Sequence, residues 1–198
     1  MKKLWLNIKK IINKIAWRWN IHWSNFYWRR EREDVLLEFN DRKRPAESAD
    51  AFVKRSALTV WDNWTYKHDG WEQLRDSTPP PPYAYKMICA ARCKKSDLFK
   101  DDCDGYHAGL YHFLAHTGFD VYLLSILSVK TDYGHCVTAY RDETGRWHIH
   151  DYLTDYADAD TLEELIEKHY NDVTGGEYVW GVKTWDYRAK KYKGVTIK

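Results

Sequence analysis

The stretch DDCDGY, from Asp101 to Tyr106, places a cysteine between aspartates and a run of helical spacing. Apolar residues recur every three or four positions after it, and Gly118 can end the run, so we predict a helix over 103–117. Asp101 or Asp102 can cap this helix, and Cys103 then opens it. A thiol at a helix N-terminus feels the positive end of the helix dipole, which favours the thiolate. Cys103 is therefore the candidate nucleophile.

Two later stretches, GHCVTAY at 134–140 and WHIHDYL at 147–153, flank the turn sequence Asp-Glu-Thr-Gly. We predict strands over 135–140 and 147–151, joined as an antiparallel hairpin. His135 at the start of one strand and Asp151 at the end of the next can then lie side by side. A cysteine, a histidine and an acid in such positions supply the nucleophile, the base and the group that orients the base. We expect Cys103, His135 and Asp151 to be the catalytic residues.

The remaining pattern predicts an α+β fold, with helices before an antiparallel meander. Pro79–Pro82 is expected to be an extended connector, because proline is excluded from helix interiors. Thr161 and Glu164 form a capping box. We expect a main domain at 45–198, preceded by a basic aromatic extension at 1–44. The other expected elements are helices over 4–23, most of 46–75 and 161–171, and strands over 119–130 and 178–185.

The motifs KDDCDGY (100–106), GHCVTAY and WHIHDYL resemble, in this order, those of the transglutaminase-like cysteine peptidases, in particular their bacterial branch. That family has an Asp-Cys-acid-Asp-Tyr-Ala nucleophile motif, a Gly-His-small-Val motif and a strand ending in Asp. Gly105 stands here at the second acidic position, and Cys136 stands where alanine is usual. The resemblance implies a papain-like fold, with the nucleophile helix packed on an antiparallel sheet, and Cys–His–Asp chemistry on amide or thioester bonds.

The chemistry that the resemblance implies is that of a cysteine peptidase or amidase, with a protein or peptide substrate and a thioester intermediate. The backbone N–H of Cys103 and the indole N–H of Trp71 are the expected oxyanion donors. Transfer of the acyl group to an amine, as in a transglutaminase, is an alternative that the sequence does not separate from hydrolysis. A third possibility is a non-catalytic structural or adaptor protein that keeps the fold, for example a phage particle component.

Several neighbouring residues have competing interpretations. Asp155 is a rival for the role of Asp151, but we interpret it as a loop acid. We expect His148 and His150 to be structural or surface residues, and Cys136 to point into the core. A zinc site is also conceivable, but its spacing is not a common one and we expect no metal and no other cofactor. Its four ligands would be Cys89, Cys93, Cys103 and His107.

The charge of the chain is unevenly distributed. Lys and Arg number 31 and Asp and Glu 29, a balance that argues against a wholesale nucleic-acid binder. Residues 1–30 hold eight basic and no acidic residues, so the other 168 residues sum to −6 (+2 minus +8). No apolar h-region or cleavage site indicates a signal peptide, so we expect cytoplasmic synthesis with free thiols. Membership in a larger assembly or virion remains open.

The helix expected over 4–23 carries an apolar stripe between basic residues. The stripe has three possible partners: the chain's own domain, another protein, or an anionic membrane surface. Eleven tryptophans in the whole chain, five of them in residues 1–30, argue against a free solvated tail. The stripe consists of Leu4, Ile8, Ile11, Ile12, Ile15 and Trp19.

Overall fold

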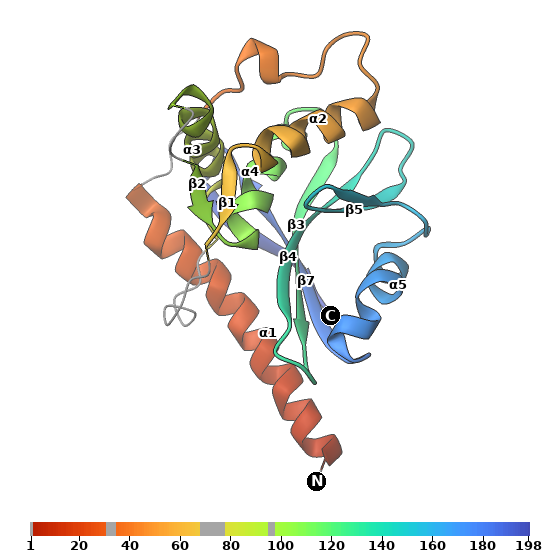
Figure 1. The fold of residues 1–198 in the computed structure, drawn as a ribbon. Coiled ribbons are helices and arrows are strands. Elements are labelled where there is room, and N and C mark those ends of the chain that lie inside the picture. Colours follow the sequence, from red (N-terminus) through yellow and green to blue (C-terminus); the bar gives the residue numbers. More distant parts are fainter. Residues whose placement is uncertain (1, 31–34, 68–77, 95–97) are drawn as a thin grey trace.

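The computed structural model describes residues 2–30, 35–67, 78–94 and 98–198, and its centre is a six-stranded antiparallel sheet (Figure 1). The strands lie in the order β6-β5-β4-β3-β7-β8, and each pairs antiparallel with its neighbour. Their bounds are β3 Asp120–Ser128, β4 Gly134–Arg141, β5 Trp147–Asp151, β6 Thr154–Tyr156, β7 Tyr178–Asp186 and β8 Lys191–Ile197. The expected α+β class is confirmed. Two more short strands, β1 Trp64–Tyr66 and β2 Phe99–Asp101, pair in parallel.

Helices cover both faces of the large sheet. They are α1 Lys2–Tyr27, α2 Ala49–Trp61, α3 Pro81–Lys94, α4 Cys103–Ala115 and α5 Leu162–Thr174, with short 3₁₀ helices at Trp28–Arg30 and Phe39–Asp41. The capping box expected from Thr161 and Glu164 opens α5, and Gly175 ends the helix in the left-handed conformation.

Alternate side chains of β3 and β4 pack into two different apolar cores, one on each face of the sheet, because successive side chains of a strand point to opposite faces. Leu123 and Tyr140 face a core that includes α2, α3 and α4. Leu124 and Val137 face a second core, which α5 covers. Helix α4 is the central helix, and every residue from Asp104 to Leu114 is buried. This burial fixes the N-terminal end of α4, where Cys103 lies.

Two expectations for the segment before α4 are wrong. Pro81 and Pro82 form the first turn of α3 rather than an extended connector. Proline is accepted there because its fixed φ suits a helix and its missing N–H would have no helical partner. The helix expected over most of 46–75 ends at Trp61, and β1 follows because it pairs with β2. Residues 68–77 lie outside the described part.

Helix α1 docks on β7 and β8 through its polar side. The Trp17 ring is buried against Gly181 and Gly194, where an added Cβ would lie 2.6 and 2.7 Å from the ring. Asn13 donates a hydrogen bond to the Ser128 carbonyl, and Asn25 exchanges two with the backbone of Tyr192. The residues of the apolar stripe are exposed, so none of the residues that the structure describes covers the stripe. Figure 1 shows α1 running along the sheet, with its N-terminal end extending past the strands.

Candidate active site

Cys103 is the first residue of α4, and a turn of aspartates sets its position. Asp102 is the N-cap, and its carboxylate accepts the Asp104 N–H at 3.0 Å. The Asp101 carboxylate in turn accepts the Asp102 N–H at 3.0 Å. These bonds satisfy N–H groups that a helix start leaves without carbonyl partners. The backbone of Cys103 is therefore held in a defined geometry at the end of a buried helix.

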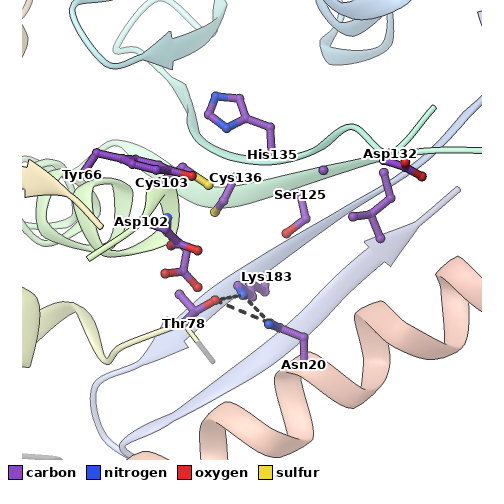
Figure 2. A pocket seen from close by; sticks show the side chains of 13 residues that line it. Asn20, Tyr66, Thr78, Asp102, Cys103, Ser125, Asp132, His135, Cys136 and Lys183 are labelled. Atoms are coloured by element: carbon purple, nitrogen blue, oxygen red, sulfur yellow. Dashed lines mark hydrogen bonds between the residues drawn. The ribbon is translucent and has the colours of Figure 1, made fainter. Parts of the chain in front are cut away.

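Cys103 and His135 line the same pocket, which has a volume of about 350 Å³ (Figure 2). Its wall is contributed by α1, α4 and the strands β3, β4 and β7. Three carboxylates, those of Asp102, Asp104 and Asp132, lie in this wall. The single lysine among the lining residues is Lys183, whose ammonium is buried and donates to Asn20 Oδ1 at 2.8 Å and to Thr78 Oγ1. The lining therefore carries an excess of negative charge.

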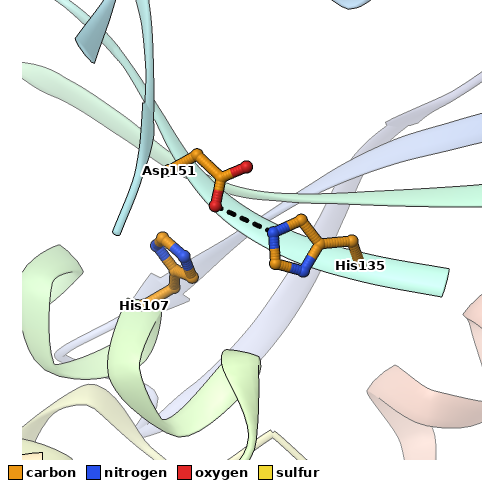
Figure 3. A group of neighbouring side chains, drawn as sticks. All are labelled: His107, His135 and Asp151. Carbon is orange, nitrogen blue, oxygen red and sulfur yellow. Dashed lines mark hydrogen bonds and ion pairs between the residues drawn. The ribbon is translucent and has the colours of Figure 1, made fainter. Parts of the chain in front are cut away.

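The imidazole of His135 is hydrogen-bonded to Asp151 (Figure 3). His135 Nε2 donates to Asp151 Oδ1 at 2.9 Å, a contact that arises because β4 and β5 pair with Thr138 opposite His150. The second oxygen of Asp151 accepts the Tyr170 hydroxyl at 2.9 Å. Burial alone would raise the pKa of Asp151, but the bond and charge of His135 hold it below its usual value. Asp151 is thus an ionised acceptor that fixes the His135 ring.

The side chain of Cys103 is a protonated thiol, whereas the sequence predicts a thiolate. Burial raises its pKa well above the usual value, and the nearby Cys136, Asp102 and Asp104 add to this effect. Among the described residues, no hydrogen bond joins the Cys103 sulfur to His135. The expectation of a thiolate, which rested on the helix dipole, is therefore wrong for this state. Desolvation and the negatively charged neighbours raise the pKa of Cys103 by more than the dipole lowers it. Cys103 is a thiol here, and a base must remove its proton before it reacts.

The rival acid, Asp155, belongs to a different cluster. It lies on β6 rather than in a loop, and its carboxylate accepts hydrogen bonds from Tyr140 at 3.2 Å and His148 at 3.0 Å. The other ring nitrogen of His148 lies 3.3 Å from Asp142. His150 is buried, and its pKa is lowered by that burial.

Two further expectations concern Cys136 and Trp71. Cys136 is buried in the core that includes α2, α3 and α4, and it also lines the pocket beside Cys103. Trp71, the expected second oxyanion donor, lies outside the described residues. Of the two expected oxyanion donors, only the backbone N–H of Cys103 belongs to a described residue.

The four residues of the alternative zinc site do not form a cluster in the described part of the chain. Cys89 Sγ contacts Arg92 on α3 at 3.8 Å, and Cys93 is exposed. A different set, His107, His135 and Asp151, offers ligand atoms within 4.8 Å of one another (Figure 3). Two imidazoles and a carboxylate are suitable ligands for zinc.

His107 is the member of this set that the sequence pairs with Cys103, as a ligand of the alternative zinc site, and not with His135 and Asp151. It is fully buried, and burial lowers its pKa well below the usual value. The Thr138 hydroxyl donates to the His107 carbonyl at 3.3 Å, so its oxygen accepts from His107 Nδ1 at 3.1 Å. His107 Nε2 then keeps a lone pair, and this buried atom has no hydrogen-bond partner among the described residues. The spacing of four residues, which places Cys103 and His107 on one helix face, is the signal behind the expected pairing of these two residues.

Comparisons with protein-family models, curated proteins and solved structures give no match to this chain. Function is therefore inferred from the arrangement of the chain's own side chains.

Proposed function

We propose that this chain is a papain-like, transglutaminase-type cysteine hydrolase that cleaves an amide bond through a thioester. The observation that carries this proposal is that Cys103 and His135 line one pocket, while the carboxylate of Asp151 accepts a hydrogen bond from Nε2 of His135. A nucleophile, a base and an orienting acid are the three groups that such chemistry needs. The sequence motifs around these residues point to the same family.

In the proposed reaction, His135 Nδ1 removes the proton of the Cys103 thiol as the sulfur attacks the carbonyl carbon. The N–H of Cys103 stabilises the oxyanion, because the start of α4 leaves this donor without a helical partner. His135 then gives its proton to the leaving amine, and a thioester remains. Water, activated by His135, hydrolyses the thioester and regenerates the thiol. Asp151 stabilises the imidazolium in both steps.

The acidic lining supports a basic peptide as the substrate. Three carboxylates against one ammonium favour a cationic group near the scissile bond, because opposite charges attract strongly where water is partly excluded. The same carboxylates would also attract a lysine side chain or another amine. This supports transglutaminase-type transfer as the second candidate, in which an amine replaces water as the acyl acceptor.

The test is covalent labelling of the proposed nucleophile. The purified chain is treated with peptides bearing a C-terminal vinyl sulfone after Lys or after Glu, which adds irreversibly to a reactive thiol as a thioether, and adducts are measured by intact mass. We expect a Lys-peptide adduct on Cys103 that Cys103→Ser abolishes, with Cys93→Ser as the matched control. In a separate reaction the chain is given the matching Lys peptide as an amide substrate: release of the free acid in water, or its diversion to the cadaverine amide, separates hydrolysis from transfer. The absence of any adduct at Cys103 would favour the non-catalytic structural role instead.

A further inference from the structure

Helix α1 exposes its apolar side and buries its polar side. Asn13, Trp17 and Asn25 face the sheet, whereas the opposite side carries large apolar residues in solvent. At 100° per residue, the large apolar residues that are exposed between 4 and 19 fall within an arc of about 120°. They are Leu4 (64% exposed), Trp5 (57%), Ile8 (39%), Ile11 (58%), Ile12 (50%), Ile15 (62%) and Trp19 (56%). We call these seven residues the α1 stripe.

Basic side chains flank the α1 stripe. Lys9 lies beside one edge of the arc, and Lys14 and Arg18 lie beside the other. Lys14 and Arg18 are exposed, and α1 contains no acidic residue at all. A wide apolar face between cationic edges, with tryptophans on the apolar face, is typical of helices that lie in a membrane interface.

We propose that α1 docks this protein on the surface of an anionic phospholipid membrane, with the α1 stripe at the boundary of headgroups and acyl chains. The lipid phosphates would then meet Lys9, Lys14 and Arg18. A second copy is the weaker alternative, because pairing two α1 stripes brings together two sets of cations with no acid on either helix. The helix lies on the membrane and does not cross it, since the described residues include no helix that is long and apolar enough to span.

Docking through the α1 stripe leaves the contacts of α1 with the sheet intact, because those contacts use the other side of the helix. Asn20 on that side lines the pocket and accepts from Lys183 at 2.8 Å. The pocket would therefore be held close to the lipid, separated from it by the thickness of one helix, about 10 Å. A membrane-bound chain would reach substrates that are displayed near the membrane surface.

The test uses flotation of the full chain with vesicles. One vesicle type contains phosphatidylcholine and phosphatidylglycerol in equal amounts, and the other contains phosphatidylcholine alone. The triple variant Ile8→Ser, Ile11→Ser, Ile15→Ser removes apolar area from an exposed face, so the fold should be retained. Leu58→Ser, an exposed leucine on α2 (49% exposed), is the matched control.

We expect the wild-type chain and the Leu58 variant to float with anionic vesicles, at least tenfold more than with neutral ones. The triple variant should lose at least tenfold in partitioning, and added salt should weaken binding of the wild-type chain. Unchanged melting of the triple variant checks the fold, and iodoacetamide labelling of Cys103 reports on the pocket independently. Equal flotation of the triple variant would overturn the proposal. A wild-type dimer that the triple variant dissociates, without vesicle binding, would assign the α1 stripe to a second copy.

Discussion

The carboxylate of Asp101 lies directly against Gly105, so that a Cβ at Gly105 would be 2.3 Å from Asp101 Oδ2. Real Cβ atoms do not approach oxygen so closely, and a side chain at position 105 would have to displace Asp101. This contact gives a physical reason for glycine at a position where the resembling family has an acid. The turn that sets Cys103 thus uses its first aspartate as a packing element.

Gly105→Ala should therefore destabilise the fold, although alanine is the better helix former by about 1 kcal/mol. We expect a net loss of about 1–2 kcal/mol from forcing the Asp101 side chain to move. Urea unfolding measures this loss. The Asp101 Cβ would lie 2.4 Å from the added Cβ, so the compensating change must remove the whole side chain. Asp101→Gly combined with Gly105→Ala should recover most of the loss relative to Asp101→Gly alone, and an equal loss in the Asp101→Gly background would show that Asp101 is not the obstacle.

The raised pKa of the Cys103 thiol predicts slow alkylation. At pH 7 iodoacetamide should label the exposed Cys93 well before Cys103, because the thiolate is the reactive form. Asp102→Asn keeps a good helix cap and removes one negative neighbour, so it should speed labelling of Cys103. Peptide mapping by mass spectrometry measures each site. Preferential labelling of Cys103 at pH 6 would mean that its thiolate is stabilised after all.

Asp151→Asn should lower turnover by about 10³–10⁴-fold while the chain stays folded, because Asn no longer fixes the His135 tautomer. Asp155→Asn should leave turnover nearly unchanged and lower the melting temperature instead, since it weakens the contact with His148. Rates on one basic peptide and thermal unfolding compare the two variants. A larger loss of activity in the Asp155 variant would transfer the orienting role to that residue.

His112 should make the fold sensitive to acid. Burial lowers its pKa to about 3, so it is neutral in the folded chain, whereas the unfolded chain protonates it below about pH 6.5. The unfolded state then binds more protons, and stability falls as the pH drops from 6.5 toward 3. His112→Gln should flatten this dependence in urea unfolding at pH 7, 5.5 and 4. The exposed His22→Gln is the control, and parallel curves for all three proteins would refute the assignment.

Trp17 should anchor α1, whereas the α1 stripe should not. Trp17→Ala removes a ring seated on Gly181 and Gly194 and should cost about 3–5 kcal/mol. Ile15→Ser, on the exposed side, should change the free energy of unfolding by less than about 0.5 kcal/mol. Chemical unfolding of both variants decides between these roles. A large loss in the Ile15 variant would mean that the stripe is covered within the chain.

Local signals explain which elements could be predicted. The helix of Cys103, the hairpin of His135 and Asp151 and the capping box of α5 each show their pattern within about fifteen residues of sequence. The strands β1 and β2 have three residues each, too few for a period to appear. The burial of Trp17, which lies outside the apolar stripe, could not be predicted, because the surface on which it packs is formed by glycines far along the chain.

The protonation of Cys103 could not be derived from sequence for a similar reason. Its helix dipole is a local property, but its burial beside Cys136 depends on tertiary packing. The helical spacing predicts that His107 lies on the same face as Cys103, but its place beside His135 and Asp151 depends on tertiary packing.

The docking of α1 on β7 and β8 has a consequence for how the protein folds during its synthesis on the ribosome. Helix α1 is synthesised before β7 and β8, which provide the surface on which Trp17 packs. Asn20 can therefore complete the pocket wall only after β7 and β8 have left the exit tunnel. Until then the nascent chain lacks this part of the pocket wall, so the surroundings of the Cys103 thiol are complete only after β7 and β8 have folded.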